Sequence, residues 1–251
     1  MTIERSASGQ IITREKKPYN ERLFSKGWRR YLHEARYHWL NRKIRQYLPG
    51  KPSVLELGCF DAKTIDYLPA GFSRYTGYDA NWEGGLELGK QRWKDRPDVM
   101  LIESQNLSGF NPANEKYDCS IALETVEHIA IAELDGYLRK LADSTRHYCF
   151  ISVPYEQGVP LLLKYLYKSV LRKVDEPYRP AELVAAIRGD LQQVQRVEHG
   201  HKGFDYRDLL RKMEPHFAIV EITPLPFRRL PQQLNFSVGI VARPRHNDRK
   251  T

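Results

Sequence analysis

The chain has 251 residues and a net charge of +9, and 41% of its residues are hydrophobic. This composition is that of a soluble protein, and the length favours one α/β domain with an elaboration over two full domains. No apolar run reaches the roughly 18 residues of a membrane span, and the polar start lacks the apolar region of a signal peptide, so we expect a cytoplasmic protein.

The positive charge lies on the two flanks of the chain. Residues 1–50 carry +8 and residues 154–251 carry +6, whereas residues 51–153 carry −5. Basic flanks around an acidic centre favour an anionic partner such as a phosphate group, a membrane surface or a nucleic acid. The alternative is that the flanks only keep the protein soluble.

The first 48 residues divide into an arm and a helix. Residues 1–19 are polar, mixed in charge and without clear periodicity, which predicts a mobile arm. From Asn20 to Leu48, apolar residues recur at three- and four-residue steps, and Pro49 and Gly50 end the pattern. This predicts one long helix or two short ones.

The centre of the chain begins with a buried strand that breaks at a glycine. Residues 54–57 suit a parallel strand, Gly58 permits a tight turn, and the amides that follow can face an acceptor. A second strand, at residues 74–79, ends on Asp79, at the distance where one intervening helix would place a carboxylate beside a ribose. Alternatively, Asp79 caps the helical stretch that follows it.

Five further strands follow, interrupted by an insertion. We expect them at residues 99–104, 118–123, 147–154, 216–222 and 234–243, the last two as an antiparallel pair at the sheet edge. Helices are predicted at residues 62–68, 131–142, 161–173, 181–197 and 206–213, and residues 155–200 form the insertion. Cys59, Cys119 and Cys149 lie on or beside predicted strands without metal-ligand spacing, and we expect reduced core residues.

Four segments carry a resemblance to a known family. They are E-L-G-C-F-D-A (56–62), Y-D-A-N (78–81), K-Y-D-C-S-I-A-L-E-T-V-E-H-I (116–129) and F-I-S-V-P (150–154). In this order they resemble the class I (Rossmann-like) S-adenosylmethionine-dependent methyltransferases, in the branch that includes ubiquinone and menaquinone biosynthesis methyltransferases. The resemblance covers roughly residues 47–244, but Phe60 and Ala62 stand where the family usually has its second and third glycines.

The resemblance implies an α/β fold and a cofactor, S-adenosyl-L-methionine. The fold would be a seven-stranded Rossmann-like methyltransferase sheet, mostly parallel with an antiparallel last strand, helices on both faces and a helical cap insertion at 155–200. The methyltransferase domain would span residues 20–251. By resemblance, the residues expected at the cofactor are Glu56, Gly58, Cys59, Phe60, Asp61, Asp79, Ala80, Glu103, Ser104, Leu123 and Glu124.

Individual roles follow from the same resemblance. Asp79 would bind both ribose hydroxyls, Glu103 and Ser104 would lie at the adenine, and Leu123 and Glu124 would line the methionine end. Ala80 would pack on the adenine. In the family a leading helix often closes over the cofactor, so Tyr31, Arg36 or Tyr37 could also reach the site.

A histidine follows the fourth strand directly, where substrates bind in such sheets. A hydroxyl acceptor has to lose a proton during methyl transfer, and His128 is our candidate for the general base. The alternative is that His128 packs on the next helix or is bound by Glu127. His199 and His201 have the H-x-H spacing of metal ligands, but the sequence offers no clear third ligand, and we expect no metal. Tyr155 and His201 are candidates for substrate binding.

We therefore expect O-methylation of a small-molecule, sugar, glycan or lipid-linked acceptor. A nucleic-acid methyltransferase is the first alternative, because of the basic flanks. Against it, the fourth strand ends in L-E-T-V-E-H, whereas base-amino methyltransferases usually carry an Asn- or Asp-Pro-Pro segment there. The second alternative is a catalytically silent cofactor-binding module, suggested by Phe60 and Ala62.

The insertion also suggests a contact with membranes. Lys164, Lys168 and Arg172 lie on one stripe of the predicted helix at 161–173, whose remaining surface is apolar, so the helix could dock peripherally on an anionic membrane or a lipid-linked substrate. The alternative is a cap helix that buries its apolar face on the core. The sequence does not indicate an oligomeric state.

Overall fold

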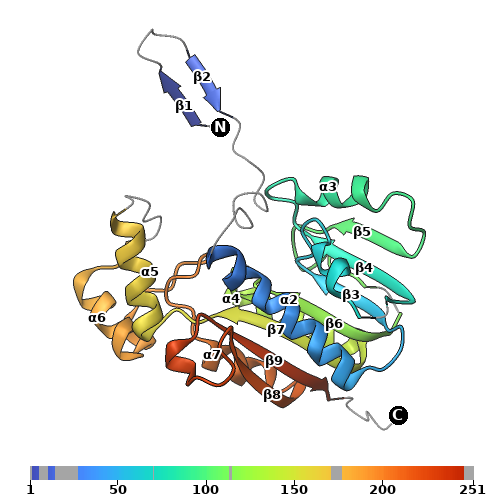
Figure 1. Ribbon diagram of the computed structural model, residues 1–251. Coiled ribbons are helices and arrows are strands. Elements are labelled where there is room, and N and C mark those ends of the chain that lie inside the picture. Colours follow the sequence, from blue (N-terminus) through green and yellow to red (C-terminus); the bar gives the residue numbers. More distant parts are fainter. Residues whose placement is uncertain are drawn as a thin grey trace.

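The computed structural model describes residues 2–5, 11–14, 28–69, 71–112, 115–170 and 177–245. A seven-stranded sheet forms its centre, in the order β5-β4-β3-β6-β7-β9-β8 (Figure 1). The strands are β3 (Ser53–Leu57), β4 (Arg74–Asp79), β5 (Val99–Glu103), β6 (Tyr117–Leu123), β7 (Thr145–Pro154), β8 (Phe217–Leu225) and β9 (Ser237–Pro244). All run parallel except β9, which is antiparallel to both of its neighbours. The predicted fold class is confirmed.

The direction in which successive strands are added to the sheet reverses beside β3. The chain builds outward from β3 through β4 to β5, then returns to place β6 on the other side of β3. Ligands of open parallel sheets bind at this kind of reversal, beyond the carboxyl ends of the strands. The segments after β3, β4 and β6 are those predicted to hold the site.

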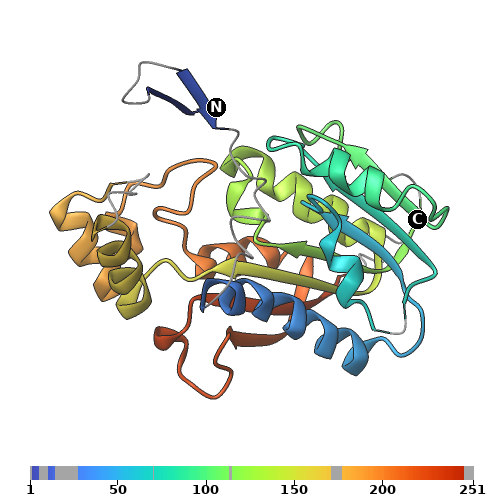
Figure 2. The ribbon, with the colours of Figure 1, turned by 45° about the horizontal axis from the view of Figure 1, so that its top comes forward.

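Helices cover both faces of the sheet, as the alternation of side chains along its strands requires. Val54 packs with α2 (Trp28–Tyr47), the 3₁₀ turn η1 (Lys63–Tyr67) and α3 (Gly85–Arg92), whereas Leu55 packs with α4 (Ile131–Ser144) and α7 (Tyr206–Met213). Figure 2 shows α2 and α4 on opposite sides of the sheet. None of the described helices is long and apolar enough to cross a membrane.

The insertion forms a small helical unit with its own core. It contains α5 (Gly158–Val170), α6 (Pro180–Arg188) and the 3₁₀ turn η3 (Leu191–Gln193). Leu161 of α5 packs with Ala185 and Ala186 of α6 and with Leu191 and Val194. In both ribbon views the unit lies beyond the end of β7, far from β5 (Figures 1 and 2).

Several element boundaries differ from the sequence prediction. The leading helix begins at Trp28, and the predicted residues 20–27 lie outside the described part of the chain, as do residues 171–173 of the insertion helix. The helix predicted over 181–197 ends at Gly189, whose φ of 82° is left-handed, and only one 3₁₀ turn follows. Asn235 is fully buried and its amide bonds to the carbonyls of Phe227 and Pro231, so the last strand starts at Ser237 rather than at residue 234.

The predicted arm contains a strand pair that the sequence did not indicate. β1 (Thr2–Arg5) and β2 (Ile11–Arg14) pair antiparallel. The remainder of residues 1–19 lies outside the described residues, and the mobility of the arm stays a prediction.

Candidate functional site

The turn after β3 requires the glycine that the sequence places there. Gly58 has a φ of +73°, and a β carbon on it would lie 2.2 Å from Oγ1 of Thr125, which follows β6. The amides of Gly58 and Cys59 both donate to the carbonyl of Tyr78, at 2.7 and 3.1 Å. The turn therefore packs closely between Tyr78 at the end of β4 and Thr125, which follows β6.

The next two left-handed positions of this loop are not glycines. Phe60 has a φ of 50° and Ala62 a φ of 56°, which costs about 1 to 2 kcal/mol for each L-residue. The Phe60 ring packs where a β carbon of Gly85 would lie, only 2.3 Å from its ring carbons. The loop thus keeps a glycine-type backbone at the positions where the sequence departs from the family pattern.

Asp79 holds this loop from the end of β4. One of its carboxylate oxygens accepts the Phe60 amide at 2.8 Å and the other accepts the Asn81 amide at 2.7 Å. Burial raises the pKa of Asp79, and the two amides oppose that rise. Because each oxygen has a second lone pair, the carboxylate can still accept two donors from a ligand.

The remaining predicted cofactor residues divide into three groups: beside Asp79, around the loop after β3, and at the end of β6. Beside Asp79, its neighbour Ala80 is half-buried, Glu103 accepts the Asn81 side-chain amide at 3.3 Å, and the Ser104 amide donates to the Asp79 carbonyl at 2.8 Å. Asp79 and Glu103 are direct partners across β4 and β5, so these residues share one edge.

The second group lies on β3 or in the loop that follows it. Glu56 and Cys59 are buried, Glu56 accepting the hydroxyls of Thr64 (2.7 Å) and Tyr75, and the Cys59 sulfur packing over Gly77. Asp61 accepts the Lys63 amide at 3.2 Å. The cofactor roles of these residues stay predictions.

The end of β6 carries Leu123, which is buried, and Glu124, which has a φ of 52°. The Glu124 amide donates to the Ser152 carbonyl at 2.8 Å. Burial raises the pKa of Glu124, and Arg36 of α2 opposes the rise through its charge. Of the three candidates on the leading helix, Tyr31, Arg36 and Tyr37, it is Arg36 whose charge acts on Glu124. Tyr37 is buried and stacks on Tyr67.

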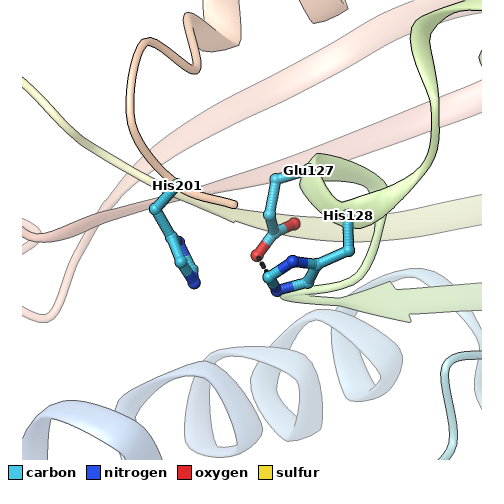
Figure 3. Close-up of side chains that lie close together, drawn as sticks. All are labelled: Glu127, His128 and His201. Atoms are coloured by element: carbon cyan, nitrogen blue, oxygen red, sulfur yellow. Dashed lines mark ion pairs between the residues drawn. The ribbon is translucent and has the colours of Figure 1, made fainter. Parts of the chain in front are cut away.

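Glu127, His128 and His201 come together in a cluster that the sequence did not predict. Glu127 and His128 belong to the 3₁₀ turn η2 (Val126–His128), and His201 comes from the loop before α7 (Figure 3). One ligand atom of each residue lies within 4.8 Å of the other two. The His128 and His201 rings meet edge to face, with centroids 4.9 Å apart.

His199, the other histidine of the H-x-H pair, fixes His128 instead of joining the cluster. Nδ1 of His128 lies 2.8 Å from the His199 carbonyl, and Nδ1 of His199 lies 2.7 Å from the His128 carbonyl. The His199 ring also meets the ring of Trp82, at 5.8 Å between centroids. Trp82 follows Asp79 in the loop after β4. Through its contacts with Trp82 and His128, His199 therefore links that loop to the histidine cluster.

Of the two residues predicted to bind substrate, the structure brings only His201 to this cluster. Tyr155 is buried in the core and its ring lies 6.0 Å from that of Tyr206. Sequence reasoning considered Glu127 only as a hydrogen-bond partner of His128. The adjacent Glu-His pair together with the distant H-x-H was the available signal, but nothing in the sequence showed that the two segments meet.

No protein-family model matches the sequence, and no curated protein is significantly similar to it. Solved structures do share the fold. An S-adenosylmethionine-dependent methyltransferase from Clostridium acetobutylicum has a TM-score of 0.60 at 10% identity, covering 90% of this chain and 95% of that one.

Two further solved structures were determined with S-adenosyl-L-homocysteine bound. Magnesium protoporphyrin IX methyltransferase from Synechocystis has a TM-score of 0.51 at 16% identity, covering 88% of this chain and 91% of that one. The N-methyltransferase NodS from Bradyrhizobium japonicum has a TM-score of 0.56 at 12% identity, covering 89% and 95%. The chain therefore has the fold of class I methyltransferases.

Proposed function

We propose that this protein is an S-adenosylmethionine-dependent methyltransferase. The observation that carries the proposal is Asp79, whose carboxylate ends β4 at the reversal of the sheet and holds the left-handed loop that begins at Gly58. The solved methyltransferases of the same fold with bound S-adenosyl-L-homocysteine support it. Assignment to the ubiquinone and menaquinone branch rests on the sequence resemblance alone.

We propose that the cofactor lies between the two sides of the crevice. Asp79 would accept the ribose hydroxyls, Glu103 and Ser104 would lie at the adenine, and Leu123 and Glu124 at the methionine end. The amides of Cys59, Phe60 and Ala62 already donate to Tyr78, Asp79 and Cys59, so these amides, which the sequence suggested for an acceptor, are not free for the cofactor. When bound, this cofactor supplies an electrophilic methyl group on a sulfonium.

The proposed acceptor is a hydroxyl group of a small molecule, sugar, glycan or lipid-linked compound. The bound cofactor would supply the methyl group to the acceptor oxygen by in-line displacement, with a neutral thioether as the leaving group. The protein's part is alignment, exclusion of water and removal of the acceptor proton. We propose His128 for the last step; its Nδ1 is bound to a backbone carbonyl, which leaves Nε2, 3.8 Å from Glu127, as the nitrogen that could take the proton.

We further propose that the cap contacts an anionic membrane surface. The helix α5 buries Pro160 and Leu161, and its other apolar side chains are at least partly exposed, which supports this proposal over a cap helix that buries its whole apolar face. Five of its apolar side chains are exposed: Val159, Leu163, Leu166, Tyr167 and Val170. Such a face on a protein of charge +9 fits an interfacial helix better than a solvated one.

Calorimetry with S-adenosylmethionine tests the central proposal. We expect saturable binding that Asp79→Ala weakens by about 1.5 to 3 kcal/mol, because a charge-assisted contact is lost. Asp143→Ala, at an exposed position of α4, is the matched control and should bind as the wild type does. Absence of any binding heat and of any thermal shift with the wild type would refute the proposal.

The alternative functions have their own tests. A salt-dependent shift of RNA or DNA on a gel, together with methylation of that nucleic acid, would favour a nucleic-acid acceptor. If the protein binds the cofactor but produces no S-adenosyl-L-homocysteine with any hydroxyl acceptor, the silent binding module would be favoured.

A further inference from the structure

The carboxylate of Glu127 is buried without a hydrogen bond, and its ion-pair contact is with Nε2 of His128, 3.8 Å away. The residue is 0% exposed, and neither carboxylate oxygen has a hydrogen-bond partner within the described parts of the chain. The nearby Arg196 side chain donates to the Glu127 backbone carbonyl at 3.1 Å instead. A buried ionised group without hydrogen bonds is strongly destabilising, so this carboxylate requires a proton or a bound cation.

Each histidine of the cluster keeps a ring nitrogen that makes no hydrogen bond within the described residues, and Nδ1 of His201 also lies 3.9 Å from the carboxylate of Glu156. The bond from Nδ1 of His128 to the His199 carbonyl identifies Nδ1 as the protonated nitrogen, which leaves the lone pair of Nε2 directed to Glu127. Nδ1 of His201 is buried and has no hydrogen-bond partner among the described residues. Figure 3 shows the three side chains converging from two separate segments.

From these observations we propose that Glu127, His128 and His201 bind a divalent transition-metal ion. Two imidazole nitrogens and one carboxylate oxygen are a ligand set used for catalytic Zn²⁺ and for other first-row ions, with coordination positions left for water or substrate. Ligand atoms bound at about 2.1 Å in a tetrahedral site lie roughly 3.4 Å apart. The ligand atoms here lie within 4.8 Å of one another, so small rotations of the side chains would bring them to that separation.

Charges of both signs surround the cluster. The negative charges of Glu124 and Glu156 and the positive charge of Arg36 all act on the carboxylate of Glu127. Lys164 forms an ion pair with Glu156. Lys164, Lys168 and Arg36 also act by their positive charges on His201.

The ion would change the role of His128 in the proposed reaction. As a ligand, Nε2 does not take the acceptor proton itself; instead, an acceptor hydroxyl on an open coordination position becomes more acidic and loses its proton to solvent. This role rests on the proposed methyl transfer, whereas binding of the ion does not. The acceptor class it implies is a compound whose hydroxyl can coordinate a metal.

The test is metal binding by the chelator-treated full chain without cofactor. We expect calorimetry to show one Zn²⁺ per chain, and Co²⁺ to give the visible absorption of a site with nitrogen and oxygen ligands. Glu127→Gln and His201→Gln should each weaken Zn²⁺ binding at least tenfold. Glu115→Gln and His147→Gln, at exposed positions outside the cluster, are matched controls and should bind as the wild type does.

The outcomes separate this proposal from the proposed function. Absence of saturable Zn²⁺ binding, or equal binding by the wild type and both cluster variants, overturns the metal site. The Co²⁺ spectrum reports ligation directly, so a cluster variant that is merely less stable but keeps the wild-type spectrum also counts against it. Metal binding without S-adenosylmethionine binding would support the site and refute the methyltransferase proposal.

Discussion

Glu56 is a buried carboxylate with a structural task. It is 2% exposed and accepts the hydroxyls of Thr64 and Tyr75, which ties η1 and β4 to β3. Burial raises its pKa from 4.5 to about 8, and the two hydroxyl bonds only partly oppose this. The folded protein therefore favours the neutral acid near neutral pH.

The stability of the protein should depend on pH through Glu56. Because its folded pKa is raised, its contribution is fully present below pH 4.5 and is lost as the pH rises to about 8, at up to about 1.4 kcal/mol per pH unit. Glu56→Gln should remove this slope, which denaturant unfolding at several pH values measures. Glu115→Gln, at an exposed carboxylate, should keep it; equal slopes for the wild type and Glu56→Gln would contradict the assignment.

Single residues differ in how far the sequence reveals them. Gly58 and Asp79 are predictable because a local turn and a strand end determine what they do, and in the structure they lie at the carboxyl ends of β3 and β4. His201 and Glu127 depend on a tertiary contact, since the loop at His199 meets His128 across 71 residues of sequence. Spacing along the chain carries no information about such a meeting, so the sequence paired His201 with His199 and did not pair it with Glu127 and His128.

The helix α2 depends on a close approach to the last strand. Trp39 is fully buried, and a β carbon on Gly239 of β9 would lie 2.5 Å from its Cε2 atom. The helix is also held by Lys43, whose ammonium lies 2.6 Å from the carboxylate of Glu221 on β8. Since α2 also carries Arg36, this packing positions a charge near Glu124 and Glu127.

Gly239→Ala should therefore destabilise the protein by about 1 to 3 kcal/mol, as overpacking of a close-packed core does. Denaturant unfolding measures the loss. In a Trp39→Leu background the same substitution should cost clearly less, because the indole that the methyl group meets is gone. The same cost in both backgrounds would show that Trp39 is not the group that limits the approach.

At the scale of the whole molecule, the order of the elements was predictable and their fine structure was not. Buried strands separated by helical segments indicate a parallel sheet, and the interruption at 155–200 locates the cap. The backbone of the loop at Phe60 and Ala62 was not predictable, because left-handed conformations are expected only of glycine there. Tertiary packing of Phe60 on Gly85 accompanies that conformation.

The exposed face of α5 makes the membrane proposal testable. Lys164 is paired with the buried Glu156, so its reversal would disturb the site as well as the surface, and Arg172 lies outside the described residues. Leu163 and Leu166, which are 55% and 52% exposed, are better targets. Inserting one such side chain contributes about 1.5 to 3 kcal/mol.

Flotation with liposomes provides the measurement. We expect the wild type to float with anionic vesicles and much less with neutral ones, because the apolar face and the positive charge act together. The double variant Leu163→Asp, Leu166→Asp should lose most of this recovery, whereas Leu88→Asp, at an exposed position of α3, should retain it. Equal recovery from both lipids, or full recovery of the double variant, would show that α5 does not dock on membranes and that its apolar face has another partner.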